Sequence, residues 1–233
     1  MIEQIKNRIN QLSSPQKALD LSRFFKTAQG QYGFGDVFVG ITVPQLRKLA
    51  KNFCSISLQD NIKLLQSKIH EERLLALFIL ISKFENKKIN CKEQIFELYI
   101  QNIDRVNNWD LVDLSAPKII GNYLLDKPKD LLYKLAFSHN LWHRRISIIS
   151  TFTFIKNNEF SDALKISEIL LNDKHDLIHK AVGWMLREIG KRNLLVETSF
   201  LNIYYKKMPR TMLRYAIEKF DEPLRQKYLK GQI

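Results

Sequence analysis

The sequence predicts an all-α protein, a solenoid in which pairs of helices repeat to form a curved array with a basic concave groove. Apolar residues recur at three- and four-residue spacing along nearly all of the 233 residues, which is the period of an amphipathic helix. No run of alternating apolar and polar residues indicates a strand. Residues with similar surroundings also return at intervals of about 35, which is typical of stacked helical repeats.

The helical period predicts about fourteen helices joined by short loops. Ten segments show it most clearly: residues 2–12, 15–25, 43–53, 61–69, 72–84, 92–102, 130–137, 163–171, 177–190 and 211–220. Four residues are expected as N-caps, because their side-chain oxygens can accept from free N–H groups of a first turn: Ser14, Ser57, Asn140 and Ser161.

A glycine-rich segment at residues 29–40, QGQYGFGDVFVG, interrupts this pattern and holds four of the eight glycines. Glycine permits backbone conformations that other residues avoid, so the segment reads either as a linker turn or as a loop that contacts a ligand. It lacks the strand and the glycine spacing of phosphate-cradling loops, so we expect no nucleotide cofactor, and indeed no cofactor of any kind.

The repeat is clearest in the residues that open the second helix of each pair, namely Arg73, Trp109, Arg145, Lys180 and Arg214. They follow one another at intervals of 36, 36, 35 and 34 residues. Stacked repeats place equivalent positions in a row, so these residues predict a mainly basic ladder on one face. Such a ladder suits an extended polyanion.

Four residues beyond two of these positions lie Asp113 and Trp184, on the same helix faces as Trp109 and Lys180. With Arg145 they form a predicted constellation of two indoles, one carboxylate and one guanidinium. A carboxylate can stabilise an oxocarbenium-like sugar or position a water, indole faces can pack on a sugar, and arginine can hold a phosphate.

Each member of this constellation also has a structural interpretation. Asp113 and Arg145 can form a buried pair that fixes the packing between repeats. Trp109 and Trp184 can be core residues. Arg145 and its neighbour Arg144 can be solvated surface charge.

Composition limits the class of protein and its partners. With 37 Lys and Arg against 24 Asp and Glu, the formal net charge is +13, which predicts an anionic partner. Two cysteines, Cys54 and Cys91, suggest a reducing compartment, and both are expected to be buried. No membrane span or signal peptide is recognisable, so we expect a cytoplasmic protein without membrane contact. We also expect one domain over residues 1–233 and a monomer, because a repeat array that exposes a groove needs no partner to complete it.

Basic residues beside the constellation and toward the C-terminus are the candidates for contact with the phosphates of a polyanion. They are Arg144, Lys180, Arg187, Arg210 and Arg214. A solvated helix face is the alternative for the C-terminal ones. Two histidine pairs with four-residue spacing, His139 with His143 and His175 with His179, make a metal site conceivable, but we expect loop histidines and no metal.

Three segments around the constellation, NNWDLVDLSAPKIIG (107–121), NLWHRRISIIST (140–151) and KAVGWMLREIGKRN (180–193), resemble the AlkD family of DNA alkylation repair glycosylases. The segment at 35–51 is similar to that family's N-terminal region, so the resemblance extends over essentially the whole chain. It implies HEAT-like repeats and release of cationic alkylpurines, of the 3-methyladenine and 7-methylguanine type, from double-stranded DNA.

By this resemblance Asp113 is the catalytic carboxylate, Trp109 and Trp184 line the sugar, and Arg145 is a required basic residue. Phe24 stands where the family's prototype has a tyrosine, so it keeps the aromatic surface toward DNA but loses a hydroxyl.

With DNA bound, the protein would be nucleoid-associated. The sequence is compatible with three functions. The first is a monofunctional DNA glycosylase without a strand-cutting step. The second is a non-catalytic repeat module that binds branched or damaged DNA. The third is a scaffold for an acidic protein.

Overall fold

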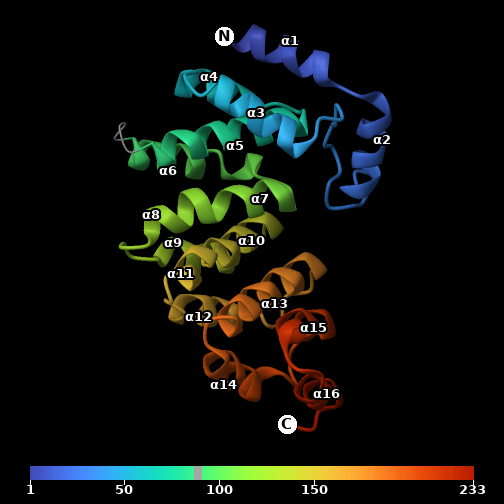
Figure 1. Ribbon diagram of the computed structural model, residues 1–233, viewed down its shortest axis with the longest axis vertical. Helices are drawn as coiled ribbons and strands as arrows, with labels where there is room; N and C mark the ends of the chain where they lie inside the picture. The colour runs from blue at the N-terminus through green and yellow to red at the C-terminus, as the bar shows by residue number, and fades with distance from the viewer. Residues whose placement is uncertain (87–90) are drawn as a thin grey trace. The chain divides into compact units, whose positions relative to one another are not determined.

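A computed structural model describes residues 1–86 and 91–233, and within them every regular element is a helix (Figure 1). The one β-type contact in these ranges is an isolated parallel bridge between Val37 and Ile69. This confirms the all-α prediction. Contacts group the chain into two compact units, Met1–Leu111 and Val112–Ile233, with the boundary inside one helix. The expected single domain and its curved, basic groove stay predictions.

Unit 1 is organised around one long buried helix. Its helices are α1 (Ile2–Leu12), α2 (Pro15–Phe24), α3 (Val43–Asn52), α4 (Leu58–Leu65), α5 (His70–Glu85), α6 (Lys92–Gln101), the short η1 (Ile103–Arg105) and the start of α7 (Trp109–Ala116). Helix α5 packs against α3, α4 and α6. Its leucines, isoleucines and phenylalanines are buried over nearly the whole length because neighbours cover it on several sides.

Unit 2 continues from α7 through a π-helical turn and a series of short helices. Its further elements are η2 (Pro117–Gly121), α8 (Asn122–Leu124), α9 (Asp130–Ala136), α10 (Leu141–Ser150), α11 (Phe152–Lys156), α12 (Ser161–Ile169), α13 (Asp176–Gly190), α14 (Leu194–Tyr204), α15 (Arg210–Ala216), η3 (Ile217–Lys219) and α16 (Glu222–Lys230). In the described residues, fourteen of the sixteen α-helices are longer than five residues, which matches the expected number.

The repeat is visible in unit 2. Helix α10 packs on α13, and α13 packs on α15. Arg145, Lys180 and Arg214 each lie four residues after the first residue of these helices, so these three share one helical position. The prediction that all five ladder residues open their helices is wrong, because only Trp109 is the first residue of its helix and Arg73 lies three residues into α5. The α13–α15 contact depends on Gly183, because a Cβ there would collide with the carbonyl oxygen of Met212.

Helix starts follow the predicted caps in part. Ser57 accepts from the backbone N–H of Asp60 at 3.1 Å, and Asn140 accepts from that of Trp142 at 2.9 Å. Ser14 occupies the N-cap position of α2 without a capping side-chain bond. The prediction for Ser161 is wrong, because it is the first residue of α12 and Phe160 precedes it as the N-cap.

The cysteines also differ from expectation. Cys54 is exposed and Cys91 is partly exposed, so the prediction that both are buried is wrong. Cys54 lies in the turn after α3, and Cys91 precedes α6. Across residues 1–86 and 91–233, none of the helices is both long enough and apolar enough to cross a bilayer.

Candidate active site

An ion pair with two hydrogen bonds joins Asp113 of α7 to Arg145 of α10 in unit 2. Arg145 Nε donates to Asp113 Oδ1 at 2.8 Å, and Nη2 donates to Oδ2 at 2.7 Å. The Asp113 side chain keeps 14% of its surface exposed, whereas that of Arg145 keeps 6%. A forked contact of this kind fixes the orientation of the carboxylate. The structure thus brings two of the predicted site residues together.

Arg145 also reaches a third helix. Its Nη1 donates to the backbone carbonyl of Leu177, in the first turn of α13, at 2.5 Å. One guanidinium therefore connects α7, α10 and α13. This arrangement serves the structural interpretation of the pair as well as the functional one, because removing Arg145 would loosen three helices at once.

Trp184 lies on the same helix as Leu177, two turns further along, and therefore on a similar face. The ring is partly exposed. Its Nε1 donates to Glu188 Oε1 at 3.3 Å, and its centroid is 5.8 Å from that of Phe152. These contacts hold the edge of the indole and leave part of its surface open to solvent.

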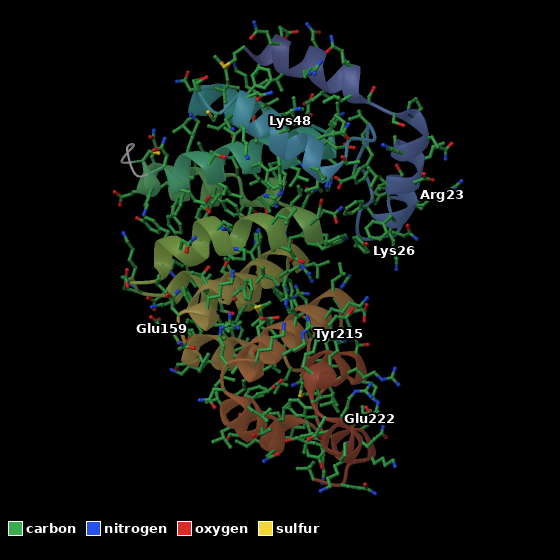
Figure 2. All side chains as sticks on the ribbon, viewed as in Figure 1. Arg23, Lys26, Lys48, Glu159, Tyr215 and Glu222 are labelled. Carbon is green, nitrogen blue, oxygen red and sulfur yellow. The ribbon has the colours of Figure 1, made fainter. Side chains whose placement is uncertain are left out.

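Trp109, the first residue of α7, belongs to unit 1. Its ring stacks on Phe25 at 5.1 Å between centroids with 17° between the planes. Phe24 meets it edge-on at 5.8 Å and is itself 63% exposed. The predicted DNA-facing Phe24 is therefore an exposed aromatic next to Trp109, and the exposed Arg23 and Lys26 flank this end of α2 (Figure 2).

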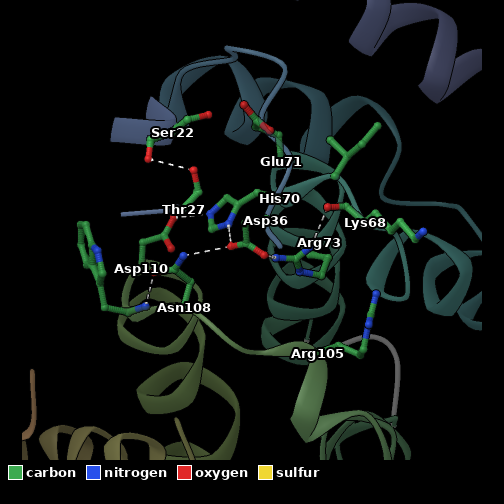
Figure 3. A network of polar contacts seen from close by, with 12 residues as sticks. Ser22, Thr27, Asp36, Lys68, His70, Glu71, Arg73, Arg105, Asn108 and Asp110 are labelled. Carbon is green, nitrogen blue, oxygen red and sulfur yellow. Dashed lines mark hydrogen bonds and ion pairs between the residues drawn. The ribbon is translucent and has the colours of Figure 1, made fainter. Parts of the chain in front are cut away.

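A buried polar network beside Trp109 is absent from the sequence-based prediction. His70 at the start of α5 binds two carboxylates, with Nδ1 3.0 Å from Asp36 Oδ2 and Nε2 2.9 Å from Asp110 Oδ2 (Figure 3). Asp36 comes from the glycine-rich segment and also accepts from Arg73 at 2.5 Å and from Asn108 at 2.9 Å. The one signal in the sequence was Asp36 itself, the single charged residue of residues 29–40.

The charges in this network shift each other's proton affinity. Burial opposes the charged form of His70, but the hydrogen bond and charge of Asp110, and those of Asp36, outweigh it and raise the pKa of His70 to about 9. Burial likewise opposes ionisation of Asp36, while the His70 hydrogen bond and the Arg73 charge lower the pKa of Asp36 overall. His70 is therefore an imidazolium at neutral pH, donating from both nitrogens.

The predicted basic ladder is not a row of exposed cations. Arg73 and Arg145 are 2% and 5% exposed, and each is paired with a carboxylate of its own unit. That part of the expectation is wrong, because the first turn of α5 uses Arg73 to hold the glycine-rich segment. Arg214, in contrast, is exposed on α15.

The remaining candidates for DNA contact have partners of their own. Arg144 Nε pairs with Asp173 at 2.5 Å, Lys180 pairs with Asp176 at 2.7 Å, Arg187 pairs with Glu218, and Arg210 Nη1 donates to the Leu229 carbonyl at 2.8 Å. These contacts restrict the four side chains, and those of Arg144 and Arg187 are only 18% and 16% exposed. Whether they meet phosphates stays a prediction.

The second histidine pair, His175 with His179, is used in local structure. His175 is the N-cap of α13, where its Nδ1 accepts from the Leu177 N–H at 3.1 Å, and His179 Nε2 lies 2.5 Å from the Asp173 carbonyl oxygen. In the part of the chain that the structure describes, no group of three or more His, Cys, Asp or Glu residues is arranged to hold a metal ion.

Comparison with known proteins identifies the relatives of this chain. A solved structure named as a predicted DNA alkylation repair enzyme from Enterococcus faecalis has a similar fold, with a TM-score of 0.68 and 17% sequence identity, over 90% of this chain and 97% of that one. Among curated proteins, none matches. The family model described as DNA alkylation repair enzyme matches residues 5–220. The chain therefore belongs to the family of DNA alkylation repair enzymes.

Proposed function

We propose that the protein is a DNA glycosylase that hydrolyses the N-glycosidic bond of cationic alkylated purines in duplex DNA. The observation that carries this proposal is the Asp113–Arg145 pair, a carboxylate held in orientation by a buried guanidinium yet still partly open to solvent. A negative charge fixed in this way stabilises a cation that forms beside it.

The chemistry needs little else from the protein. In an N3- or N7-alkylated purine the leaving base already carries a positive charge, so the bonding electrons return to the base and it departs neutral without a general acid. The sugar becomes an oxocarbenium-like cation, and water adds to it with loss of a proton. Asp113 acts as the ion-pairing stabiliser of this cation or as the group that orients the water.

Aromatic surface would complete the site on the sugar side. Trp184 supplies a partly exposed indole on α13, and the resemblance gives Trp109 the same role. Arg145 would then hold Asp113 and, through Leu177, the helix that carries Trp184. The basic surface residues would bind phosphates and so hold the duplex with little sequence preference.

The proposal is tested by incubating the protein with duplex DNA that carries radiolabelled N-methylpurines and separating the released bases by chromatography. We expect free 3-methyladenine or 7-methylguanine, with the DNA strand intact until alkali cleaves the abasic site. Salt-sensitive DNA binding without any released base would instead support the non-catalytic DNA-binding module. If duplex DNA neither bound nor competed with an acidic protein, the scaffold function would replace both.

Phosphate contact by the exposed Arg214 gives a second test. Each phosphate contact contributes about 0.9 to the slope of log affinity against log salt concentration. Arg214→Gln is therefore expected to weaken duplex binding and to reduce this slope by about one. Lys134→Gln, an exposed residue of α9 outside the predicted set, serves as the control. Equal slopes for both variants and the original protein, measured by fluorescence anisotropy, would remove Arg214 from the interface.

A further inference from the structure

The two residues on either side of Trp109 in the sequence are both tied to one buried network. Asn108 accepts from the Trp109 backbone N–H at 2.9 Å through Oδ1, while its Nδ2 donates to Asp36. Asp110, the next residue, binds His70. The backbone of Trp109 is thus fixed on both sides by the side chains of Asn108 and Asp110. Both of these side chains meet the Asp36–His70 pair (Figure 3).

The same network reaches the indole through aromatic contacts. The His70 ring lies 4.5 Å from Phe38 and 5.1 Å from Phe25, measured between centroids. Phe25 in turn stacks on Trp109. A change in the position or charge of His70 would therefore alter the surroundings of the Trp109 ring as well as the position of its backbone.

The network is buried and electrically balanced. Two cations, His70 and Arg73, face two carboxylates, Asp36 and Asp110, and all four side chains are between 2% and 8% exposed. Among the described residues, Asp110 Oδ1 has no hydrogen-bond partner. The buried negative charge of Asp110 is therefore offset by the contact of its Oδ2 with His70. Loss of the His70 proton would leave a buried negative charge without its counter-ion, which is unfavourable in an apolar interior.

The loop that supplies Asp36 is itself held in place. Glu71, adjacent to His70, is 2% exposed, and its carboxylate accepts from the backbone N–H groups of Val39, Gly40 and Ile41 at 2.8 to 3.3 Å. Gly40 has a φ of +85°, a conformation that favours glycine. Two residues of the first turn of α5 therefore hold the loop: Glu71 binds the backbone of residues 39–41, and Arg73 binds Asp36. These contacts keep Asp36 in place when His70 changes.

We propose that Asp36, His70 and Asp110 are positioning residues, which hold the Trp109 indole in the orientation that the glycosylase reaction needs. This inference rests on the proposed function for the role of Trp109 and adds the residues that orient it. Because both ring nitrogens of His70 must donate, the orientation depends on the imidazolium form. The charged groups facing His70 are Asp36 from the loop and Asp110 from α7, with Arg73 and Glu71 beside it on α5.

The test follows Trp109 directly, in full-length protein labelled with 5-fluorotryptophan. The chain has three tryptophans, so the fluorine spectrum should show three resonances, assigned by replacing each with phenylalanine in turn. We expect His70→Gln and Asp110→Asn to shift or broaden the Trp109 resonance and to leave those of Trp142 and Trp184 unchanged. Asp110→Asn is the milder variant because it keeps the size of the side chain. It therefore carries the test if His70→Gln does not fold.

The matched control is His139→Gln, which replaces an exposed histidine of unit 2 and should leave all three resonances in place. In the original protein the Trp109 resonance is expected to titrate with a midpoint near the His70 pKa of about 9, and in Asp110→Asn that midpoint should move to lower pH. A Trp109 resonance that ignores both the variants and pH would overturn the proposal.

Kinetics separate positioning from a purely structural role. Single-turnover base release is expected to slow about 10- to 100-fold in both variants, with DNA affinity unchanged, since a displaced group costs rate rather than binding. Normal release despite a displaced Trp109 resonance would also overturn the proposal. If the original protein releases no base, the proposed glycosylase function fails, and the fluorine spectra alone then decide whether the network orients Trp109.

Discussion

Replacing Asp113 by asparagine is expected to lower the single-turnover rate of base release by at least about 10³-fold while duplex binding changes little. A loss of that size corresponds to about 4 kcal/mol of transition-state stabilisation. Asparagine keeps the shape and can still accept from Arg145, but it carries no negative charge to oppose the sugar cation. The measurement is release of labelled methylpurine with the protein in excess over DNA.

Such a loss must be distinguished from damage to the fold, because Asp113→Asn also leaves the buried Arg145 without its counter-ion. The double variant Asp113→Asn, Arg145→Gln removes the unpaired buried cation but also the Arg145–Leu177 contact, so it should recover only part of the stability and none of the activity. Asp173→Asn is a matched control, since it takes a carboxylate from Arg144, the neighbouring arginine of α10. At saturating protein it should still release base. An active double variant would show that the pair only fixes packing.

Replacing Glu197 by glutamine is expected to stabilise the protein at neutral pH. Glu197 of α14 is 1% exposed, and burial raises the pKa of its carboxyl to about 9, against the opposing charge of Arg187. The folded chain therefore binds one more proton than the unfolded chain between pH 4.5 and 9, so its free energy of unfolding falls as pH rises through that range. At pH 7 this cost is about 3 kcal/mol, which a neutral glutamine of the same shape avoids.

The measurement is urea unfolding at a series of pH values, followed by far-UV circular dichroism. Below pH 6.5 the slope due to Glu197 should disappear in the variant. Above pH 6.5 a slope should remain, because His70 with its raised pKa also loses its stabilising proton as pH approaches 9. Glu159→Gln, at an exposed position between α11 and α12 (Figure 2), should leave the pH dependence unchanged. Identical slopes in all three proteins would show that Glu197 is ionised in the folded state.

Local physics explains what the sequence could predict. Helices such as α1 and α13 follow directly from apolar spacing, and Asn140 marks the start of α10 because a capping oxygen has a fixed place relative to the first turn. The Asp113–Arg145 contact could also be predicted from the sequence. The two residues occupy neighbouring repeats at a separation of 32, and stacking brings such positions together.

The network around His70 follows no such period. Asp36 lies in an irregular segment, 34 residues from His70 and 72 from Asn108, and the path of that segment is decided by the buried Glu71 and Arg73. A charge pattern cannot reveal which carboxylate a buried histidine will meet when a loop is folded by tertiary contacts. The burial of Arg73, expected as part of an exposed ladder, has the same origin.

The placement of the cysteines allows the two compact units to be followed by separate optical signals. Both thiols of the sequence, Cys54 and Cys91, belong to unit 1, and Cys54 is the exposed one. A maleimide dye on Cys54 would report on unit 1, whereas the intrinsic fluorescence of Trp142 and Trp184 arises in unit 2. In a Trp109→Phe background the two halves of the chain thus carry independent reporters, and one denaturation experiment can show whether they lose their structure together or in sequence.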